Sequence, residues 1–263
     1  APESIFAAFE RAPIASASVA QVHRAGLFDG REVAVKVRRP RIEQIVSFDL
    51  AVMRLVARAV ALVPSFRLLA PVESVDEFGR AIRTQIDLTV EAGNNRRFRA
   101  NFAGDPDVAL PELVPELCSR RVLTMSFVRG VKLFDHRRVN ADPTRLARIG
   151  FRLLLRMVFE HGFVHADLHP GNILVTEAGT VVLLDLGLTA ELDEQHRRIF
   201  ALYFAAWAQG DGATMARLMA DFSPSARVVD YPGYQADIER FVGRYHGKAL
   251  GEVAVSQVVF DMM

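Results

Sequence analysis

Three side chains that can supply oxygen ligands, Asp167, Asn172 and Asp185, lie between residues 164 and 187, which read VHADLHPGNILVTEAGTVVLLDLG. Residues 173–184 hold two short β-rich runs separated by Glu-Ala-Gly, and this pattern predicts a hairpin. Because pairing brings the outer ends of the two strands together, the amide of Asn172 and the carboxylate of Asp185 can share one Mg²⁺ ion. Asp167 lies in the loop that enters the hairpin. This order of groups indicates phosphoryl transfer from a metal-bound nucleotide.

Lys36 is a further candidate, because it lies in the β-rich run VAVKV with its side chain on the face opposite Val35 and Val37. A single strand lysine commonly points into water, so Lys36 alone favours no function. The preceding stretch, PIASASVAQVHR, has small residues where a nucleotide-binding loop commonly has glycines. We therefore expect Lys36 to contact phosphates. We expect the same of the loop residues, which are Ala15, Ser16, Ala17 and Ser18.

A kinase-like site also needs a carboxylate on a helix that holds the strand lysine. The spacing of apolar residues predicts one helix over residues 41–63 and a second over residues 71–102. Glu91 lies in the second helix, near the border of its apolar face. Most helix carboxylates are solvated, but in this context we expect Glu91 to pair with Lys36.

A connector between two lobes is expected at the end of the β-rich run RVLTMSFVRG, residues 121–130. Met125 is the large residue that precedes the connector. Backbone groups near Ser126 and Val128 would then be available to bind an adenine ring. The chain is therefore divided into an N-lobe at residues 1–128 and a C-lobe at residues 129–263.

The composition limits the function classes that remain. Half of the residues are hydrophobic (51%) and the formal net charge is +1, without a basic stripe interleaved with aromatic residues, so no nucleic-acid partner is expected. Cys118 is the only cysteine, which excludes an intrachain disulfide framework. No uncharged apolar run reaches about 18 residues and no signal peptide is recognised, which predicts a cytoplasmic protein. Because the chain lacks an initial Met and ends in an apolar segment, we expect a fragment.

His165 and His169 flank Asp167 and could suggest a zinc site. Pro170 and Gly171 prevent the helix that would align the two rings, and no third ligand is near. We expect His165 instead to pack in the interior and bond to the backbone near the second strand of the hairpin.

Five motifs together resemble the UbiB-like (aarF-domain) atypical kinase family, which includes the mitochondrial ubiquinone-biosynthesis kinases. The motifs are PIASASVAQVH, VAVKVRRP, DLTVEAGN, HADLHPGN and LLDLG, and the resemblance covers nearly the whole chain. HADLHPGN alone is similar to a motif of aminoglycoside-phosphotransferase-like kinases. The alanine-rich loop is therefore the motif that distinguishes the two families.

The resemblance implies an α+β class with a two-lobed protein-kinase-like fold: an antiparallel sheet with long helices, then a mainly helical C-lobe. It implies binding of ATP or ADP with Mg²⁺, in which Lys36 contacts phosphates and pairs with Glu91, Asn172 and Asp185 hold the metal, and Asp167 is the catalytic-loop aspartate. ATPase behaviour is expected ahead of protein phosphorylation. The implied partners are an isoprenoid lipid such as ubiquinone, a membrane surface that the protein would contact peripherally, and lipid-biosynthesis proteins.

Two departures from the family pattern are visible. The family has Glu-x-Asp where this chain has Gln85-Ile86-Asp87, and the K-x-G-Q extension is absent from these residues. Two other functions stay open. One is a small-molecule phosphotransferase of the aminoglycoside or choline kinase type, which the arginine-rich helices disfavour. The other is a non-catalytic nucleotide-binding scaffold.

Overall fold

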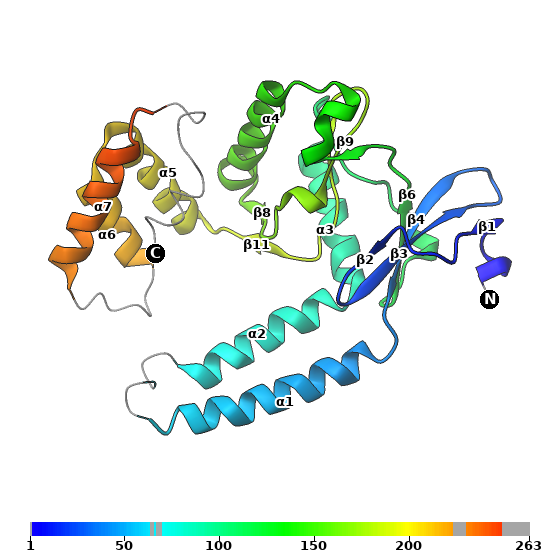
Figure 1. Cartoon of the computed structure of the whole chain (residues 1–263), viewed down its shortest axis with the longest axis horizontal. Coiled ribbons are helices and arrows are strands. Elements are labelled where there is room, and N and C mark those ends of the chain that lie inside the picture. The colour runs from blue at the N-terminus through cyan, green and yellow to red at the C-terminus, as the bar shows by residue number, and fades with distance from the viewer. Residues whose placement is uncertain (1, 64–65, 67–69, 223–229, 249–263) are drawn as a thin grey trace. The chain divides into compact units, whose positions relative to one another are not determined.

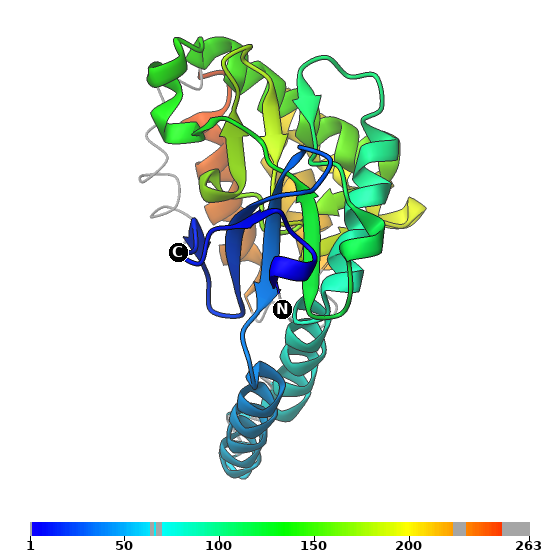
Figure 2. The same cartoon turned by 90° about the vertical axis from the view of Figure 1, so that its right-hand side faces the viewer.

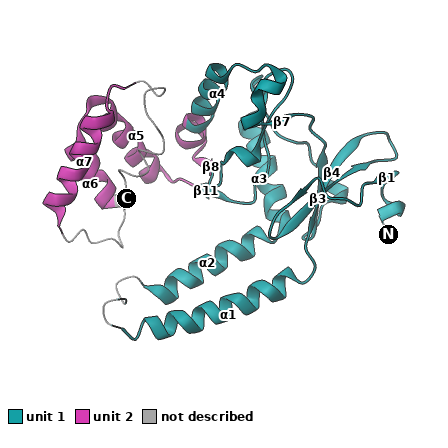
Figure 3. Ribbon diagram, viewed as in Figure 1, with its two compact units in different colours: residues 1–154, 165–190 teal, residues 155–164, 191–263 magenta. Residues whose placement is uncertain are grey.

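The structure is a computed structural model that describes residues 2–63, 66, 70–222 and 230–248. The chain forms two compact units (Figure 3), one of residues 1–154 and 165–190 and one of residues 155–164 and 191–263. The lobe boundary predicted after residue 128 lies inside the first unit and stays a prediction. Residues 249–263 of the predicted C-lobe lie outside the described residues.

An antiparallel sheet forms the N-terminal part of the first unit (Figure 1), and its presence confirms the prediction. Its strands are β1 (Ala8–Phe9), β2 (Ala15–Ser16), β3 (Ala20–Gly26), β4 (Glu32–Arg38) and β6 (Val122–Ser126). The order is β1-β3-β4-β6, with β2 also paired to β3. Val33 and Val35 of β4 pack with Phe6 and Leu27 in an apolar core. Since side chains alternate along a strand, Lys36 points to the opposite face.

Among the described residues, three α-helices lie between β4 and β6 along the chain. Helices α1 (Ile42–Val60) and α2 (Pro71–Gln85) lie side by side and project from the sheet, as the turned view in Figure 2 also shows. Helix α3 (Leu88–Asn101) follows α2.

The prediction of one helix over residues 71–102 is wrong, because the chain breaks between α2 and α3. The side chain of Asp87 accepts a hydrogen bond from the Thr89 N–H and caps the start of α3. The carbonyl of Ile86 accepts a hydrogen bond from the Arg38 guanidinium. Both contacts replace bonds that a continuous helix would make along its own axis.

A second sheet carries the predicted hairpin. Its strands are β5 (Val108–Ala109), β7 (Val131–Lys132), β9 (Ile173–Val175) and β10 (Val181–Leu183), in the order β5-β10-β9-β7. The antiparallel pairing of β9 with β10 confirms the hairpin. A 3-10 turn, Pro170–Asn172, leads directly into β9. Asn172 and Asp185 therefore lie at the open end of this hairpin.

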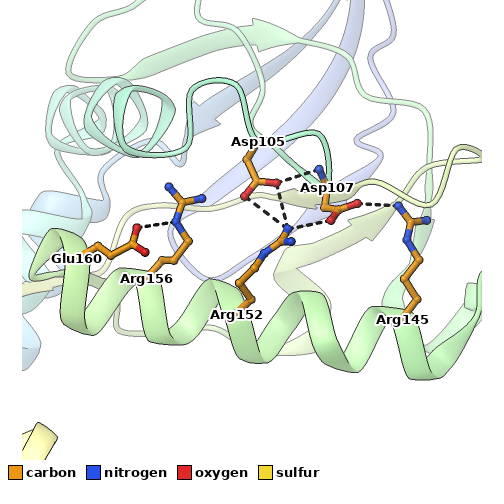
Figure 4. Close-up of polar contacts among 6 residues, drawn as sticks. All are labelled: Asp105, Asp107, Arg145, Arg152, Arg156 and Glu160. Carbon is orange, nitrogen blue, oxygen red and sulfur yellow. Dashed lines mark hydrogen bonds and ion pairs between the residues drawn. The ribbon is translucent and has the colours of Figure 1, made fainter.

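Helix α4 (Pro143–Leu155) is held to the loop between α3 and β5 by ion pairs, drawn in Figure 4. Arg152 donates to Asp105 at 3.1 Å and to Asp107 at 2.8 Å, and Arg145 donates to Asp107 at 2.7 Å. The carbonyl of Asp107 also accepts a hydrogen bond from the Val181 N–H of β10. This loop thus connects the helix that carries Glu91 with the hairpin and with α4.

The second unit consists mainly of the helices α5 (Glu194–Gln209), α6 (Gly212–Phe222) and α7 (Tyr231–Tyr245). Ala206, Met215 and Val242 form their apolar core. The chain passes between the units at the end of α4, within β8 (Phe163–His165) and within β11 (Thr189–Glu191). In the part of the chain that the structure describes, no helix has both the length and the apolar character that a bilayer-spanning segment needs.

Candidate functional site

Lys36 lies at the centre of the site. Its Nζ donates to both carboxylate oxygens of Glu91, at 2.8 and 3.0 Å, and to Oδ1 of Asp185 at 2.9 Å. The side chains of Lys36 and Glu91 are only 9% and 4% exposed, whereas that of Asp185 is 44% exposed. A strand, a helix and the end of a hairpin thus bring together three residues that are far apart in the sequence.

Burial and the charges in this cluster shift three pKa values. Burial raises the pKa of Glu91 above its ordinary value, although the charge of Lys36 opposes this shift. Burial disfavours the charged form of Lys36, but the carboxylates of Glu91 and Asp185 outweigh this effect and raise its pKa above the ordinary value. Burial also acts to raise the pKa of Asp185, yet the charge of Lys36 and its hydrogen bond lower that pKa overall. Asp185 is therefore ionised and Lys36 protonated at neutral pH.

The backbone at Asp185 has a φ of 49°, in the left-handed region that only a minority of non-glycine residues occupy. Asp is among the side chains that tolerate this conformation. The turn lets the carboxylate of Asp185 face Lys36 immediately after β10, while the next residue, Leu186, is buried in the core.

His165 organises the loop before the hairpin. Its Nδ1 accepts a hydrogen bond from the Asp167 N–H at 3.1 Å, and its Nε2 lies 3.4 Å from the Leu184 carbonyl. The predicted packing of His165 against the second strand is therefore confirmed. Asn172 donates through Nδ2 to the Asp167 carbonyl, which leaves its amide oxygen available to a metal.

Arg39 holds the loop of small residues in place. Its Nε donates to the Ala17 carbonyl at 2.9 Å, and its Nη2 donates to the Ser16 hydroxyl at 2.7 Å. The loop itself closes through a bond from the Ala17 N–H to the Ala20 carbonyl. Arg39 is not among the residues predicted from the sequence. The only signal available was its position three residues after Lys36, next to Pro40.

A cavity of about 420 Å³ unites most of the predicted residues. Lys36, Glu91, Asn172 and Asp185 line it. It is also lined by the predicted loop and connector residues Ala15, Ser16, Ala17, Met125, Ser126 and Val128. Ser126 and Phe127 use their N–H groups within the protein, whereas the Val128 N–H has no partner among the described residues.

Two predicted residues lie outside this cavity. Ser18 is exposed at the tip of the loop and does not line the cavity wall. Asp167 is also exposed, and its carboxylate lies 3.9 Å from His169 rather than against Lys36 or Asp185. A larger groove of about 660 Å³ lies between α1 and α2, but its ionisable lining is four arginines and Asp76, without the lysine and amide of the first cavity.

Comparison with known proteins defines the family. The model of one protein family, described as "ABC1 atypical kinase-like domain", matches residues 1–219. The chain belongs to the ABC1 atypical kinase-like family. Among its relatives, "Probable protein kinase UbiB" of Aeromonas hydrophila subsp. hydrophila is 33% identical over 272 residues, covering 99% of this chain and 49% of that protein. The protein of the same name from Pseudomonas aeruginosa is 34% identical over 268 residues, covering 99% and 50%.

The chain spans about half the length of the curated relatives it matches. Among solved structures, the complex of Rv3197 with erythromycin from Mycobacterium tuberculosis is similar to this chain. The TM-score is 0.65 and the identity 24%, over 90% of this chain and 60% of that one. This similarity extends to the fold and supports the α+β class expected from the sequence.

Proposed function

We propose that this chain binds ATP or ADP with Mg²⁺ and uses the nucleotide for phosphoryl transfer or ATP hydrolysis. The observation that carries the proposal is the cluster of Lys36, Glu91 and Asp185, which shares one cavity with Asn172 and the connector. Membership of an atypical kinase family supports it. So does the size of the cavity, since ligand sites commonly measure about 300–1,000 Å³.

The two ends of the cavity suit different parts of the nucleotide. The Val128 N–H would donate a hydrogen bond to the base. Such a bond uses the backbone of the connector and does not depend on the identity of its side chains. Lys36 would donate to the phosphates in place of its present bond to Asp185, while Glu91 keeps the ammonium group oriented.

Asn172 and Asp185 would hold Mg²⁺, and the chemistry of these donors fits the ion. Mg²⁺ prefers oxygen ligands and is commonly held by one or two protein groups together with phosphate oxygens. Here the amide oxygen of Asn172 is left available by the bond from its Nδ2, and Asp185 is ionised. When bound, the ion would neutralise negative charge on the phosphates.

Asp167 would accept a proton from the attacking hydroxyl group or water, and its exposure leaves the carboxylate accessible to that group. The new bond would form between the attacking oxygen and the γ-phosphorus. The bond between that phosphorus and the β-phosphate oxygen would break, which releases ADP.

The motif resemblance extends the proposal to ubiquinone or another isoprenoid lipid, with peripheral attachment to a membrane surface and contact with lipid-biosynthesis proteins. Single-turnover ATP hydrolysis, measured with and without liposomes that contain an isoprenoid lipid, tests this part. We expect faster hydrolysis with the liposomes, and an unchanged rate would contradict the lipid link.

The nucleotide site itself is tested by thermal unfolding with and without Mg-ATP. Wild-type protein should unfold at a higher temperature with the nucleotide, because a ligand that binds only the folded state stabilises it. Lys36→Ala should abolish this shift. Lys248→Ala removes the ammonium of another lysine, which contacts the Tyr245 ring in the second unit, and should leave the shift intact. A shift that survives in Lys36→Ala would refute the assignment of the phosphate lysine.

A further inference from the structure

Lys132 is the second lysine of the candidate cavity. The chain contains three lysines, at positions 36, 132 and 248, although arginine is abundant. Two of the three, Lys36 and Lys132, line the same cavity. None of the five motifs described above contains Lys132, although its side chain lines the same cavity as Lys36.

The strand register fixes where the side chain of Lys132 emerges. Lys132 of β7 lies directly opposite Leu174 of β9, and paired residues in an antiparallel ladder project to the same face. Leu174 lines the cavity, so Lys132 projects beside it. Gly130 permits this close pairing, because the Cβ of any other residue at this position would lie 2.9 Å from the Val175 carbonyl oxygen.

The ammonium group of Lys132 has unused donors. Its Nζ donates to the Gly171 carbonyl at 2.5 Å, within the turn that carries Asn172. No carboxylate among the described residues pairs with it, in contrast to Lys36 with its two. An ammonium group has three N–H donors, so two stay available to a ligand in the cavity.

We infer that Lys132 donates to the sugar hydroxyls of the bound nucleotide and so makes the site selective for ribonucleotides. The inference rests on the proposed function. In a nucleotide whose base lies at Val128 and whose phosphates lie at Lys36, the sugar is the part between them. Lys132 lies four residues after Val128, and its side chain reaches Gly171 next to Asn172, so it is placed between the two ends.

The choice of lysine is consistent with this position. A compact ammonium on a flexible stem can bond to the Gly171 carbonyl and to ligand oxygens at once, whereas the planar guanidinium of arginine suits carboxylates and phosphates. Contact with an α-phosphate is the competing assignment. A contact with the sugar and a contact with the α-phosphate are both hydrogen bonds to a ligand oxygen. Nucleotide analogues that lack a sugar hydroxyl distinguish the two contacts.

The test measures the affinities of wild-type protein for ATP, 2′-deoxy-ATP and 3′-deoxy-ATP by calorimetry in the presence of Mg²⁺. We expect ATP to bind about tenfold more tightly than at least one deoxy analogue, equivalent to about 1.4 kcal/mol. In Lys132→Met this preference should fall below about twofold. The ratio of affinities is the readout because a general disturbance of the turn would weaken all three nucleotides alike. Lys248→Met is the matched control and should keep the wild-type preference.

Three results would overturn the inference. The wild-type protein could bind all three nucleotides equally, or Lys132→Met could keep the preference. A loss of affinity that is equal for all three nucleotides would assign Lys132 to the phosphates or to the turn. In each of these cases ATP still binds to the wild-type protein, so the proposed function stands. Absence of ATP binding in the wild-type protein would instead refute both.

Discussion

The Nζ of Lys36 lies 2.8 Å from Oε2 of Glu91, and both side chains are almost completely buried. Transfer of two charges from water into such surroundings is costly, and their attraction offsets the cost only while both are present. Either side chain alone would carry an uncompensated buried charge, so the stability of this region depends on the presence of both.

Removal of one partner should expose this cost. We predict that Lys36→Met lowers the free energy of unfolding by about 3–5 kcal/mol, because it leaves Glu91 buried and unpaired near Asp185. Glu91→Leu should lower the free energy of unfolding by less, about 1.5–3 kcal/mol, because Lys36 keeps its bond to Asp185. The double variant should be more stable than the sum of the single losses implies.

Urea unfolding of the four proteins measures these differences. Single variants that both lie within about 1 kcal/mol of the wild type would show that the ion pair is already relaxed by solvent.

Asp185→Asn tests the metal site without removing the side-chain volume. Asn keeps an oxygen but loses the charge that the neighbouring Lys36 stabilises. We expect nucleotide binding to persist weakly and to lose its dependence on Mg²⁺. Calorimetric titration with and without the ion measures the difference. Retention of full Mg²⁺ dependence in this variant would count against Asp185 as a ligand.

Arg39→Ala should loosen the loop of small residues, because both of its side-chain bonds go to Ser16 and Ala17. We expect the affinity for ATP to fall about fivefold to tenfold, the loss of roughly one hydrogen bond to a charged donor. Because Arg39 is partly exposed, its replacement should change the free energy of unfolding only slightly. Arg31→Ala, which removes an exposed pair with Asp29 in the turn between β3 and β4, is the control. Equal nucleotide affinities in the two variants would exclude a role for Arg39 in the loop.

Ala17→Gly addresses the backbone of the same loop. Ala17 lines the cavity, and a glycine there would remove the Cβ and free the backbone conformation. If the alanine restrains the phosphates, this variant should raise the affinity for ATP relative to ADP. An unchanged ratio of the two affinities would refute the idea.

Local patterns and required chemical groups can be predicted from this sequence, whereas contacts between distant elements cannot. Lys36, Glu91 and Asp185 could be predicted to converge because phosphoryl transfer requires these chemical groups and the hairpin pattern is local. The break between α2 and α3 was missed, because the apolar spacing runs through it and the Asp87 cap competes with that pattern. Contacts such as that of Arg39 with Ser16 depend on side-chain direction across strands, which periodicity does not encode. Asp167 was identified by spacing, but its exposed position required the structure.

Arg152 should contribute more to stability than Arg145, although both lie on α4. Arg152 pairs with both Asp105 and Asp107, so its removal leaves two carboxylates side by side, whereas Arg145 pairs with Asp107 and not with Asp105 (Figure 4). We predict that Arg152→Ala lowers the free energy of unfolding, by less than the loss of a buried pair would, because the Arg152 side chain is half exposed. The loss for Arg145→Ala should be smaller. Urea unfolding at low and high salt checks both, since screening should narrow the difference. Equal losses of stability in the two variants would show that pairing with both carboxylates adds nothing to the contribution of Arg152.

Protonation of His165 should destabilise the loop that carries Asp167. Burial lowers the pKa of His165 below its ordinary value; the Leu184 carbonyl and the charges of Asp167 and Asp185 act against this shift, and His169 adds to it. The unfolded chain therefore binds a proton first, and the free energy of unfolding should fall as pH drops below about 6.5. The physical reason is that Nδ1 would have to give up the Asp167 N–H to accept the proton.

His165→Asn should flatten this pH dependence between about pH 7 and 5.5, at the cost of lower stability at pH 8. His169→Asn is the matched control, because His169 lies in the same loop but is exposed. Urea unfolding across this pH range measures the slopes. The wild type and His169→Asn should lose stability in parallel as the pH falls, and His165→Asn should lose less; the slope that remains would come in part from His161, whose pKa burial also lowers. If His165→Asn keeps the wild-type slope, another group is responsible for the acid sensitivity, and the loop does not depend on a neutral imidazole.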